Sequence, residues 1–252
     1  MRFLLAGGGT GGHVNPLLAL AELLRKEGHE VIALGTKTGL EQRLVPERGF
    51  ELVTTSRLPL PRRLSLSILS FPFKLLGASL AVRSVIRSRG IDAVVGFGGY
   101  ASAPAYIAAW LARVPIVIHE ANAIAGFANR LGARFTKHRA VAFKNSNLAG
   151  ATLTGMPIRR ELVEGAPGYD SGQARVELGL DPLRPTLLVT GGSQGARSIN
   201  DAVIAALPEL GNAGIQVLHI VGEKAGLEEL NTPGYLRIAY CDRMDAAIAG
   251  TD

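Results

Sequence analysis

The segment LLAGGGTGGHVNPLLALAELL, residues 4–24, joins a short apolar run to five glycines within six positions, a histidine, and an apolar run with helical spacing. The first run predicts a buried strand and the second predicts a helix. Glycine lets the backbone between them adopt positive φ and approach a ligand, and the first turn of a helix has free N–H groups. The segment therefore predicts a strand, turn and helix that can hold a phosphate or a carboxylate.

The same alternation continues through the first 157 residues. Strands are predicted over residues 3–7, 30–36, 51–56, 92–98, 115–120, 139–143 and 151–155, and helices over 16–27, 39–48, a long region ending at Arg89, 101–112 and 125–133. Continuous Val, Ile and Leu strands separated by helices are typical of βαβ units, whose parallel sheet is covered on both faces.

After a predicted linker over residues 154–172 the pattern starts again. Strands are predicted over 186–192, 215–222 and 235–241, and helices over 196–209, shortly before residue 235, and from Met244. We therefore expect an α/β protein with two doubly wound parallel-sheet domains, residues 1–157 and 158–252, around a cleft. The second domain has about three strands, fewer than such domains normally contain, so we expect it to be incomplete.

Composition and charge separate the two halves. With 47% hydrophobic and 19% charged residues, the chain can bury two cores and is not disordered. Residues 1–160 hold 21 basic and 8 acidic residues, a net charge of +13, whereas residues 161–252 have a net charge of −7. The basic half is expected to bind phosphates or an anionic membrane. Nucleic acid is disfavoured, because this half has one Trp and no zinc, RRM or KH pattern.

The start of the chain and its single cysteine favour a reducing compartment. Four apolar residues precede the glycines, too few for a secretory signal. One cysteine, Cys241, excludes an internal disulfide.

An apolar and basic stretch lies between Arg62 and Arg89. Residues 64–82 make a poor transmembrane span, since Pro72, Lys74 and several serines interrupt them. The stretch intersperses apolar side chains with cations: Leu66, Leu69, Phe71, Phe73, Leu75 and Leu76 with Arg62, Arg63, Lys74, Arg83, Arg87 and Arg89. Such a surface suits docking on an anionic membrane. The alternative is a core helix with a solvated basic face.

Two glycine motifs of the chain also occur in other enzyme classes. Gly7, Gly9 and Gly12 match the dinucleotide motif G-x-G-x-x-G, but the second strand ends on Gly35 and Thr36 where a ribose-binding acid is needed. This disfavours a dehydrogenase.

The second motif is that of a hydrolase nucleophile elbow. Gly191, Ser193 and Gly195 match G-x-S-x-G, but the only later histidine is His219, inside an apolar strand. A serine hydrolase is therefore disfavoured as well.

Candidate site residues follow the predicted strands of the first domain. His13 opens a helix at the first glycine turn, where the positive end of the helix favours a neutral imidazole that can act as a base; the alternative is a His that only caps the turn. His119, Glu120, Asn122 and Asn129 follow another strand.

A further glycine turn contains Gly96, Gly98 and Gly99 before Tyr100. Two such turns in one domain predict more than one phosphate-bearing ligand.

Several segments together resemble the MurG family of bacterial transferases. They are GGGTGGHVNPLLALAELL, GFGGYASAPAYIAAWLARVPIVIHEANAIAGFANR, TGMPIR and GGSQGARSIN, in the family's order. The resemblance implies a GT-B fold with two Rossmann-like domains, inversion at the anomeric carbon, and no metal or other cofactor. It also implies transfer of GlcNAc from UDP-GlcNAc to undecaprenyl-pyrophosphoryl-MurNAc-pentapeptide (lipid I) for peptidoglycan synthesis, and so a role in cell shape and division, by a peripheral protein at the cytoplasmic face of the membrane.

By matching position, the resemblance also implies roles for individual residues. His13 would be the base for the acceptor's C4 hydroxyl. Donor-binding residues would be Thr10, Gly11, Gly12, Asn122, Arg159, Ser193, Gln194, Gly195 and Cys241, and acceptor-binding residues would be Gly98, Gly99, Tyr100 and Glu120. The family usually has an aliphatic residue at the position of Cys241.

The resemblance leaves two other functions open. The family pattern continues beyond Asp252 with another glycine turn, a Glu for the donor ribose and a Gln-rich segment. One alternative is therefore a non-catalytic module that binds lipid-linked pyrophosphate or membrane. The other is a related GT-B transferase or epimerase that acts on another nucleotide sugar.

Overall fold

The computed structural model describes residues 1–59, 66–158, 170–192, 194–223, 225 and 232–252. The chain divides into two compact units, Met1–Ile158 (unit 1) and Arg159–Asp252 (unit 2). This boundary lies one residue from the one that the sequence predicts.

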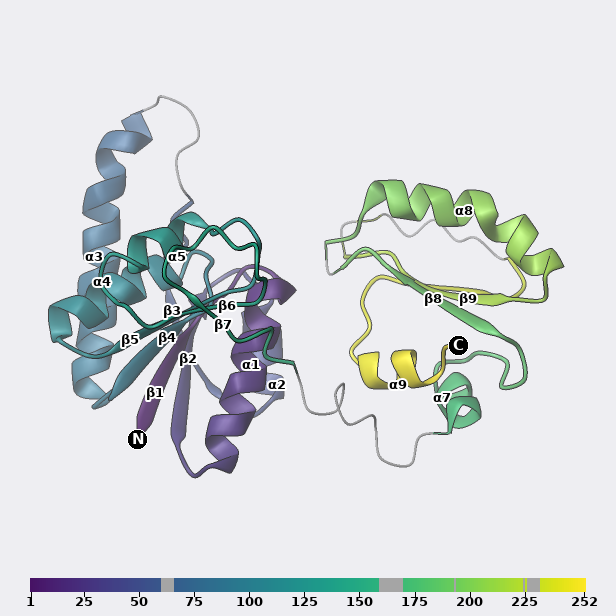
Figure 1. The fold of residues 1–252 in the computed structure, drawn as a ribbon, viewed down its shortest axis with the longest axis horizontal. Coiled ribbons are helices and arrows are strands. Elements are labelled where there is room, and N and C mark those ends of the chain that lie inside the picture. Colours follow the sequence, from purple (N-terminus) through teal and green to yellow (C-terminus); the bar gives the residue numbers. More distant parts are fainter. Residues whose placement is uncertain (60–65, 159–169, 193, 224, 226–231) are drawn as a thin grey trace. The chain divides into compact units, whose positions relative to one another are not determined.

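Unit 1 contains a seven-stranded sheet in the order β3-β2-β1-β4-β5-β6-β7 (Figure 1). Its strands are β1 (Arg2–Ala6), β2 (Glu30–Thr36), β3 (Glu51–Thr55), β4 (Ala93–Gly96), β5 (Ile116–Glu120), β6 (Arg139–Val141) and β7 (Thr152–Leu153). Its helices are α1 (Gly11–Lys26), α2 (Glu41–Glu47), α3 (Leu66–Ser88), α4 (Ser102–Ala112) and α5 (Phe127–Gly132). All adjacent strand pairs are parallel, which confirms the predicted architecture of this unit.

Side chains alternate between two cores, one on each face of the sheet. In β1, Leu4 and Ala6 pack with residues of α3 and α4, whereas Leu5 packs with residues of α1 and α2. The alternation follows from the two-residue period of a strand. Because both faces are covered, the central strands β1, β4 and β5 are largely buried and mostly apolar, as the sequence indicated.

The chain reverses its direction of winding between β1 and β4. Ala6 of β1 pairs with Leu34 of β2 on one side and with Gly96 of β4 on the other. The turns that follow β1 and β4 therefore leave the same edge of the sheet, next to each other. Ligands of doubly wound sheets bind at this point, beyond the carboxyl ends of the strands.

Helix α1 begins earlier than predicted. The sequence placed its start at residue 16, but the helix begins at Gly11, with Thr10 as the N-cap, so Pro16 lies inside it. Pro16 has no N–H and removes only one bond near the helix start. The last two glycines and His13 therefore belong to the first helical turn.

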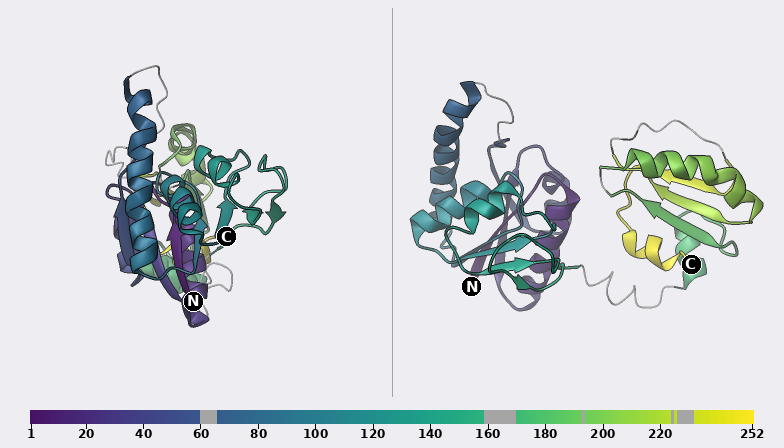
Figure 2. Two further views of the ribbon diagram at one scale, coloured as in Figure 1. Left: turned by 90° about the vertical axis from the view of Figure 1, so that its left-hand side faces the viewer. Right: turned by 45° about the horizontal axis from the view of Figure 1, so that its top comes forward.

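Helix α3 extends beyond the carboxyl edge of the sheet (Figures 1 and 2). One side of it is buried through Ala78, Ser79, Val82 and Ile86. By length and composition alone Leu69–Ser88 could cross a membrane, which differs from the prediction of a poor span. Because the buried side belongs to the core of unit 1, we interpret α3 as a surface helix of the folded unit.

Unit 2 contains a three-stranded parallel sheet in the order β10-β9-β8. Its elements are α7 (Ser171–Glu177), β8 (Thr186–Thr190), α8 (Arg197–Asn212), β9 (Gln216–Ile220), β10 (Tyr235–Ile238) and α9 (Met244–Ala249). Val203 and Leu207 of α8 pack on one face of the sheet. Residues of α9 and the segment after α7 pack on the other face, so this sheet is also covered on both sides.

Helix α7 lies partly in the predicted linker and was missed. It starts directly after Asp170, and its Arg175 is buried. The Arg175 guanidinium donates to the carbonyls of Gly250 and Pro182 and to the Asp252 carboxylate. These contacts with distant residues, rather than local apolar spacing, hold the helix. The linker residues 159–169 lie outside the described residues.

Candidate functional site

The imidazole of His13 has a fixed orientation at the first glycine turn. Its Nδ1 lies 3.1 Å from the Gly8 carbonyl oxygen and 3.2 Å from Thr10 Oγ1. Because a carbonyl oxygen only accepts, the contact with Gly8 places the proton of the neutral ring on Nδ1. The unprotonated nitrogen is then Nε2. A Cβ built on Gly98 would lie 3.1 Å from Nε2, so this nitrogen faces the second glycine turn.

A buried carboxylate packs against the first glycine turn and binds one of its amides. Glu41 is 1% exposed, and its Oε2 accepts from the Gly9 amide at 2.8 Å. Its Oε1 accepts from the backbone N–H and the hydroxyl of Thr36, both at 2.7 Å. Carbons added to Gly8, Gly35 or Gly39 would each collide with this side chain, at 2.0–2.4 Å. A side chain at any of these positions would have to displace the Glu41 carboxylate.

Glu41 bears on one prediction. The sequence predicted that both glycine turns of unit 1 are open to phosphate. At the first turn the Gly9 amide already binds an internal anion, and a second negative charge beside a buried carboxylate is unfavourable. The turn therefore has fewer free amides for a phosphate than its glycine content indicates.

The second glycine turn is tied to β1 by Ser102. The Gly98 amide donates to Ser102 Oγ at 3.0 Å, and this hydroxyl lies 2.9 Å from the Ala6 carbonyl and 2.7 Å from the Gly98 carbonyl. Gly98 and Gly99 have φ of 91° and 80°, which side chains rarely adopt. Within the described residues, the amides of Gly99 and Tyr100 have no hydrogen-bond partner. They are free to donate to an anion at the start of α4.

Glu120 organises the loop after β5. Its Oε1 accepts from the backbone N–H and side-chain amide of Asn122, and its Oε2 accepts from the Gly126 amide and Asn129 Nδ2. Four donors around one buried carboxylate offset the cost of its burial. Its predicted contact with an acceptor stays a prediction, since both oxygens already hold this loop.

The network continues into the core through Tyr106. The fully buried Tyr106 hydroxyl donates to Asn129 Oδ1 at 2.7 Å, and burial raises the pKa of this phenol. A Cβ at Gly96 would lie 2.0 Å from the Tyr106 oxygen, and one at Gly132 would collide with the ring. Two glycines thus accommodate the ring that anchors the loop.

A cavity of about 410 Å³ lies beyond this edge of the sheet, a volume within the usual range of ligand pockets. It brings together six of the predicted site residues: His13, Gly98, Gly99, Tyr100, Glu120 and Asn122. Its other walls are mostly apolar and come from the segment before α3, from α3, from α4 and from the start of α5. Thr10, Gly11 and Gly12 form the adjoining turn.

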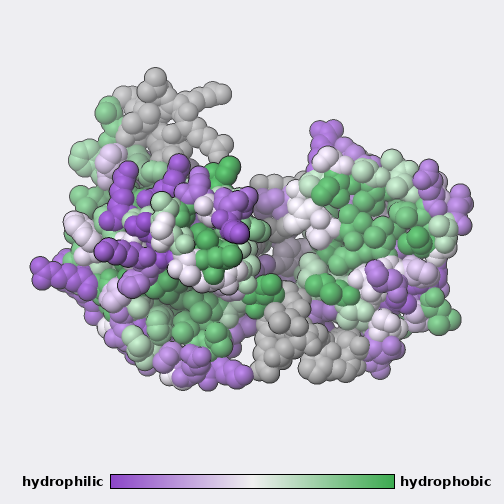
Figure 3. Space-filling view, in the orientation of Figure 1, coloured by the Kyte–Doolittle hydropathy of each residue, from purple (hydrophilic) through white to green (hydrophobic). Residues whose placement is uncertain are grey.

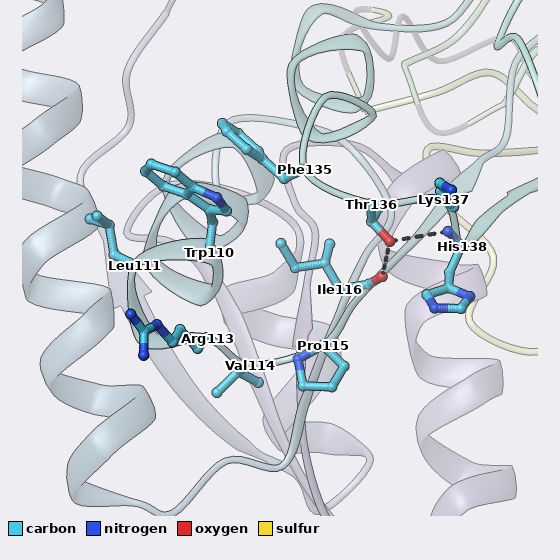
Figure 4. Close-up of a pocket in the computed structure, with 10 residues that line it drawn as sticks. All are labelled: Trp110, Leu111, Arg113, Val114, Pro115, Ile116, Phe135, Thr136, Lys137 and His138. Carbon is cyan, nitrogen blue, oxygen red and sulfur yellow. Dashed lines mark hydrogen bonds between the residues drawn. The ribbon is translucent and has the colours of Figure 1, made fainter.

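A larger hollow of about 780 Å³ lies near the start of β5, between α4 and the segment before β6 (Figure 4). Trp110 stacks on Phe135 with ring centroids 5.4 Å apart, and Thr136 Oγ1 donates to the Ile116 carbonyl. This hollow is at the amino end of the strands. Because doubly wound sheets bind ligands at the carboxyl end, it is not the candidate site.

Two turns of unit 2 interlock where its predicted site residues lie. A Cβ on Gly195 would lie 2.2 Å from the Val221 carbonyl oxygen, and one on Gly222 would lie 2.1 Å from the Gly195 amide nitrogen. The turn after β8 therefore packs directly on the backbone of the turn after β9. Gln194 belongs to the first of these turns, whereas Ser193 and Arg159 lie outside the described residues.

Two further residues of unit 2 bear on the predictions. Cys241 is buried in the apolar cluster with Leu218 and Ile220, so a ligand there would meet its main chain rather than its thiol. His219 is fully buried in β9, which confirms its prediction as a strand residue. Its Nε2 donates to Asn200 Oδ1 at 3.1 Å and its Nδ1 accepts from the Tyr235 hydroxyl at 2.9 Å.

Comparison with known proteins identifies the family. Family models for the N-terminal and C-terminal domains of glycosyltransferase family 28 match residues 3–141 and 186–252. A protein of Leifsonia xyli subsp. xyli named UDP-N-acetylglucosamine–N-acetylmuramyl-(pentapeptide) pyrophosphoryl-undecaprenol N-acetylglucosamine transferase is 53% identical over 252 residues, which cover 99% of this chain and 70% of that protein. A protein of the same name from Streptomyces avermitilis is 46% identical, with 100% and 71% covered.

Solved structures agree with this assignment. The crystal structure of Acinetobacter baumannii MurG matches with a TM-score of 0.65 and 28% identity, over 99% of this chain and 71% of that one. A UDP-GlcNAc 2-epimerase from Neisseria meningitidis matches with a TM-score of 0.64 over 99% of this chain and 74% of that one, but at 12% identity it shows the fold alone. The predicted GT-B fold is confirmed. The chain therefore belongs to the MurG family, within glycosyltransferase family 28.

Proposed function

We propose that the chain is an N-acetylglucosaminyltransferase of peptidoglycan synthesis. It moves GlcNAc from UDP-GlcNAc to the C4 hydroxyl of MurNAc in undecaprenyl-pyrophosphoryl-MurNAc-pentapeptide. The relatives that match almost the whole chain at 46–53% identity are named for this reaction. The observation that connects the reaction to this structure is the orientation of His13, whose Nε2 faces the cavity beside the second glycine turn.

His13 is the proposed base of the reaction. The acceptor's C4 hydroxyl gives its proton to Nε2 as its oxygen bonds to C1 of GlcNAc. The bond between C1 and the UDP oxygen breaks, and UDP leaves with the electron pair. The Gly8 carbonyl supports this step, since it binds the Nδ1 proton and stabilises the imidazolium that forms. Such a base contributes about 10²- to 10⁴-fold to the rate.

The acceptor pyrophosphate is assigned to the second glycine turn and the donor to unit 2. The unpartnered amides of Gly99 and Tyr100 and the start of α4 suit an anion, and Arg57 adds a positive charge 5.1 Å above the Tyr100 ring. In unit 2 the interlocked turns at Gly195 and Gly222 support a donor diphosphate loop. The proposed donor contacts of Thr10, Gly11, Gly12, Asn122, Arg159, Ser193, Gln194 and Cys241 stay predictions.

The outer side of α3 is the proposed membrane-docking surface, which makes the protein peripheral at the cytoplasmic face of the membrane. It presents an apolar stripe of four exposed residues spaced by three or four: Leu69, Phe73, Leu76 and Leu80. Green, hydrophobic surface is visible at the upper left edge of the molecule, where this helix lies (Figure 3). The opposite side of α3 belongs to the core, so the prediction of a core helix is also correct for that side. Cations such as Lys74 accompany the stripe.

Vesicle binding tests the docking surface. Phe73→Ser, at a side chain 77% exposed, is expected to lower sedimentation with anionic vesicles several-fold. The matched control is Leu183→Ser in unit 2, at a side chain 90% exposed. Equal binding by both variants would contradict a role for α3. Equal binding to anionic and uncharged vesicles would contradict the role of the cations.

Transfer of labelled GlcNAc to a lipid I analogue tests the function. The protein is expected to transfer GlcNAc, and to use UDP-GlcNAc in preference to other UDP-sugars. Binding of lipid-linked pyrophosphate without turnover would favour a non-catalytic module. A preference for a different UDP-sugar would instead favour a related GT-B enzyme.

A further inference from the structure

The cavity of unit 1 has two chemically different ends. Its polar end consists of the His13 imidazole and the second glycine turn. Its apolar end is formed by Leu58, Phe71, Leu75, Ala103 and Phe127. No predicted role for this site uses the apolar end, because a sugar and a pyrophosphate present hydroxyl and phosphate oxygens.

The apolar wall comes from a continuation of the core-facing side of α3. Phe71 and Leu75 are four residues apart, and Ala78, Val82 and Ile86 continue the same helical stripe into the core. Near the start of the helix this stripe no longer meets core residues. Phe71 and Leu75 are half-buried there and line the cavity.

The membrane-docking stripe lies on the other side of the same helix. Phe73 follows Phe71 by two residues, which places the two side chains about 200° apart around the helix axis. One side of α3 thus presents apolar side chains outward and the other presents them to the cavity. A chain of isoprene units that leaves the membrane meets apolar surface on both sides of this helix.

We infer that the apolar end of the cavity holds the first isoprene units of the prenyl chain that carries the acceptor pyrophosphate. This inference rests on the proposed function, and it identifies a lipid subsite beside the pyrophosphate turn. Unpartnered amides at Gly99 and Tyr100 and the nearby Arg57 cation suit the two phosphates, and the apolar wall suits the carbons bonded to them. A volume of about 410 Å³ suits a short piece of the chain rather than the whole lipid.

Binding of a ten-carbon prenyl pyrophosphate, measured by calorimetry below its aggregation concentration, tests the inference. Inorganic pyrophosphate is the reference ligand. We expect the protein to bind the prenyl compound at least tenfold more tightly. Phe71→Ala and Leu75→Ala should each lower the affinity for the prenyl compound three- to tenfold and leave the affinity for pyrophosphate unchanged. Two variants are used so that the test still stands if one of them misfolds. Thermal unfolding detects such misfolding.

Phe73→Ala is the matched control, since it removes an aromatic side chain of the same helix on the outward side. It should leave both affinities unchanged. Equal affinity of the unaltered protein for the two ligands, or no binding of either, would overturn the inference. An equal loss in Phe73→Ala and Leu75→Ala would also overturn it, because binding would then occur at the outer stripe.

The titration separates this inference from the proposed function. It uses no UDP-GlcNAc and requires no turnover. Prenyl-dependent binding by a protein that transfers no GlcNAc would support the subsite and contradict the transferase. Transfer of GlcNAc by a protein without prenyl-dependent binding would support the transferase and contradict the subsite.

Discussion

Glu41 Oε2 accepts a hydrogen bond from the Gly9 amide at 2.8 Å, so a carboxylate 32 residues along the chain holds the glycine turn that carries His13. All three groups around this carboxylate donate to it: the amides of Gly9 and Thr36 and the Thr36 hydroxyl. Glu41 is therefore a positioning residue for His13, acting through the backbone of the turn.

Glu41→Gln tests this role with almost no change in volume. An amide places an NH₂ group against donors and leaves a buried N–H without an acceptor, which costs about 1–3 kcal/mol. We expect a loss of this size in the free energy of unfolding, measured in urea, and a lower kcat for transfer. Glu47→Gln is the control, because Glu47 lies on the same helix and its contact with Arg43, at 3.6 Å, is solvent-exposed. Equal stability of the two variants would contradict the role of Glu41.

Two glycine substitutions are expected to act in opposite directions. Gly99 has φ of 80°, and a Cβ there would lie 2.4 Å from the Gly8 carbonyl oxygen, so Gly99→Ala should destabilise unit 1 by more than about 1 kcal/mol. Gly77 lies inside α3 with open space around it, so Gly77→Ala should stabilise the helix by about 0.5–1 kcal/mol. Thermal unfolding measures both. A Gly99→Ala variant as stable as the unaltered protein would show that the two turns are not in close contact.

The stability of unit 2 is expected to depend on pH through His219. Burial, with the nearby Arg237 charge, lowers the pKa of this imidazole from its ordinary value of 6.5. The unfolded chain therefore binds a proton near pH 6.5 that the folded unit does not bind, and stability falls as the pH drops below 6.5. His219→Gln should flatten this dependence between pH 7.5 and 5.5, measured by thermal unfolding. His138→Gln, at an exposed residue outside the helices and strands, is the control. An unchanged pH dependence in His219→Gln would contradict this account.

The strands of unit 1 could be predicted because they are buried on both faces. Segments such as residues 115–118 are apolar, and the strands' carboxyl ends place polar residues such as His119 and Glu120 at one edge of the sheet. This principle predicts that His13, Gly98 and Asn122 lie at one edge of the sheet, and the structure places all three on one cavity.

Other features depend on contacts that no local pattern reveals. In the sequence, nothing distinguishes Glu41 from other charged residues of a predicted helix. Its role follows from the fold, which places it among Gly8, Gly35 and Gly39. Helix α7 was missed because its Arg175 is held by Gly250 and Asp252, more than 70 residues away. The hydrogen bond from Asn129 Nδ2 to Glu120 Oε2 likewise depends on the loop conformation, which the spacing of the two residues does not reveal.

The most direct measurement is the kcat of GlcNAc transfer from UDP-GlcNAc to a lipid I analogue by the unaltered protein and by His13→Ala, with His29→Ala as the control. With Nε2 as the base, His13→Ala should lower kcat by about 10²- to 10⁴-fold while UDP-GlcNAc binding is retained. The control should keep the rate of the unaltered protein. A His13→Ala variant with an unchanged kcat would contradict the assignment of His13 as the base.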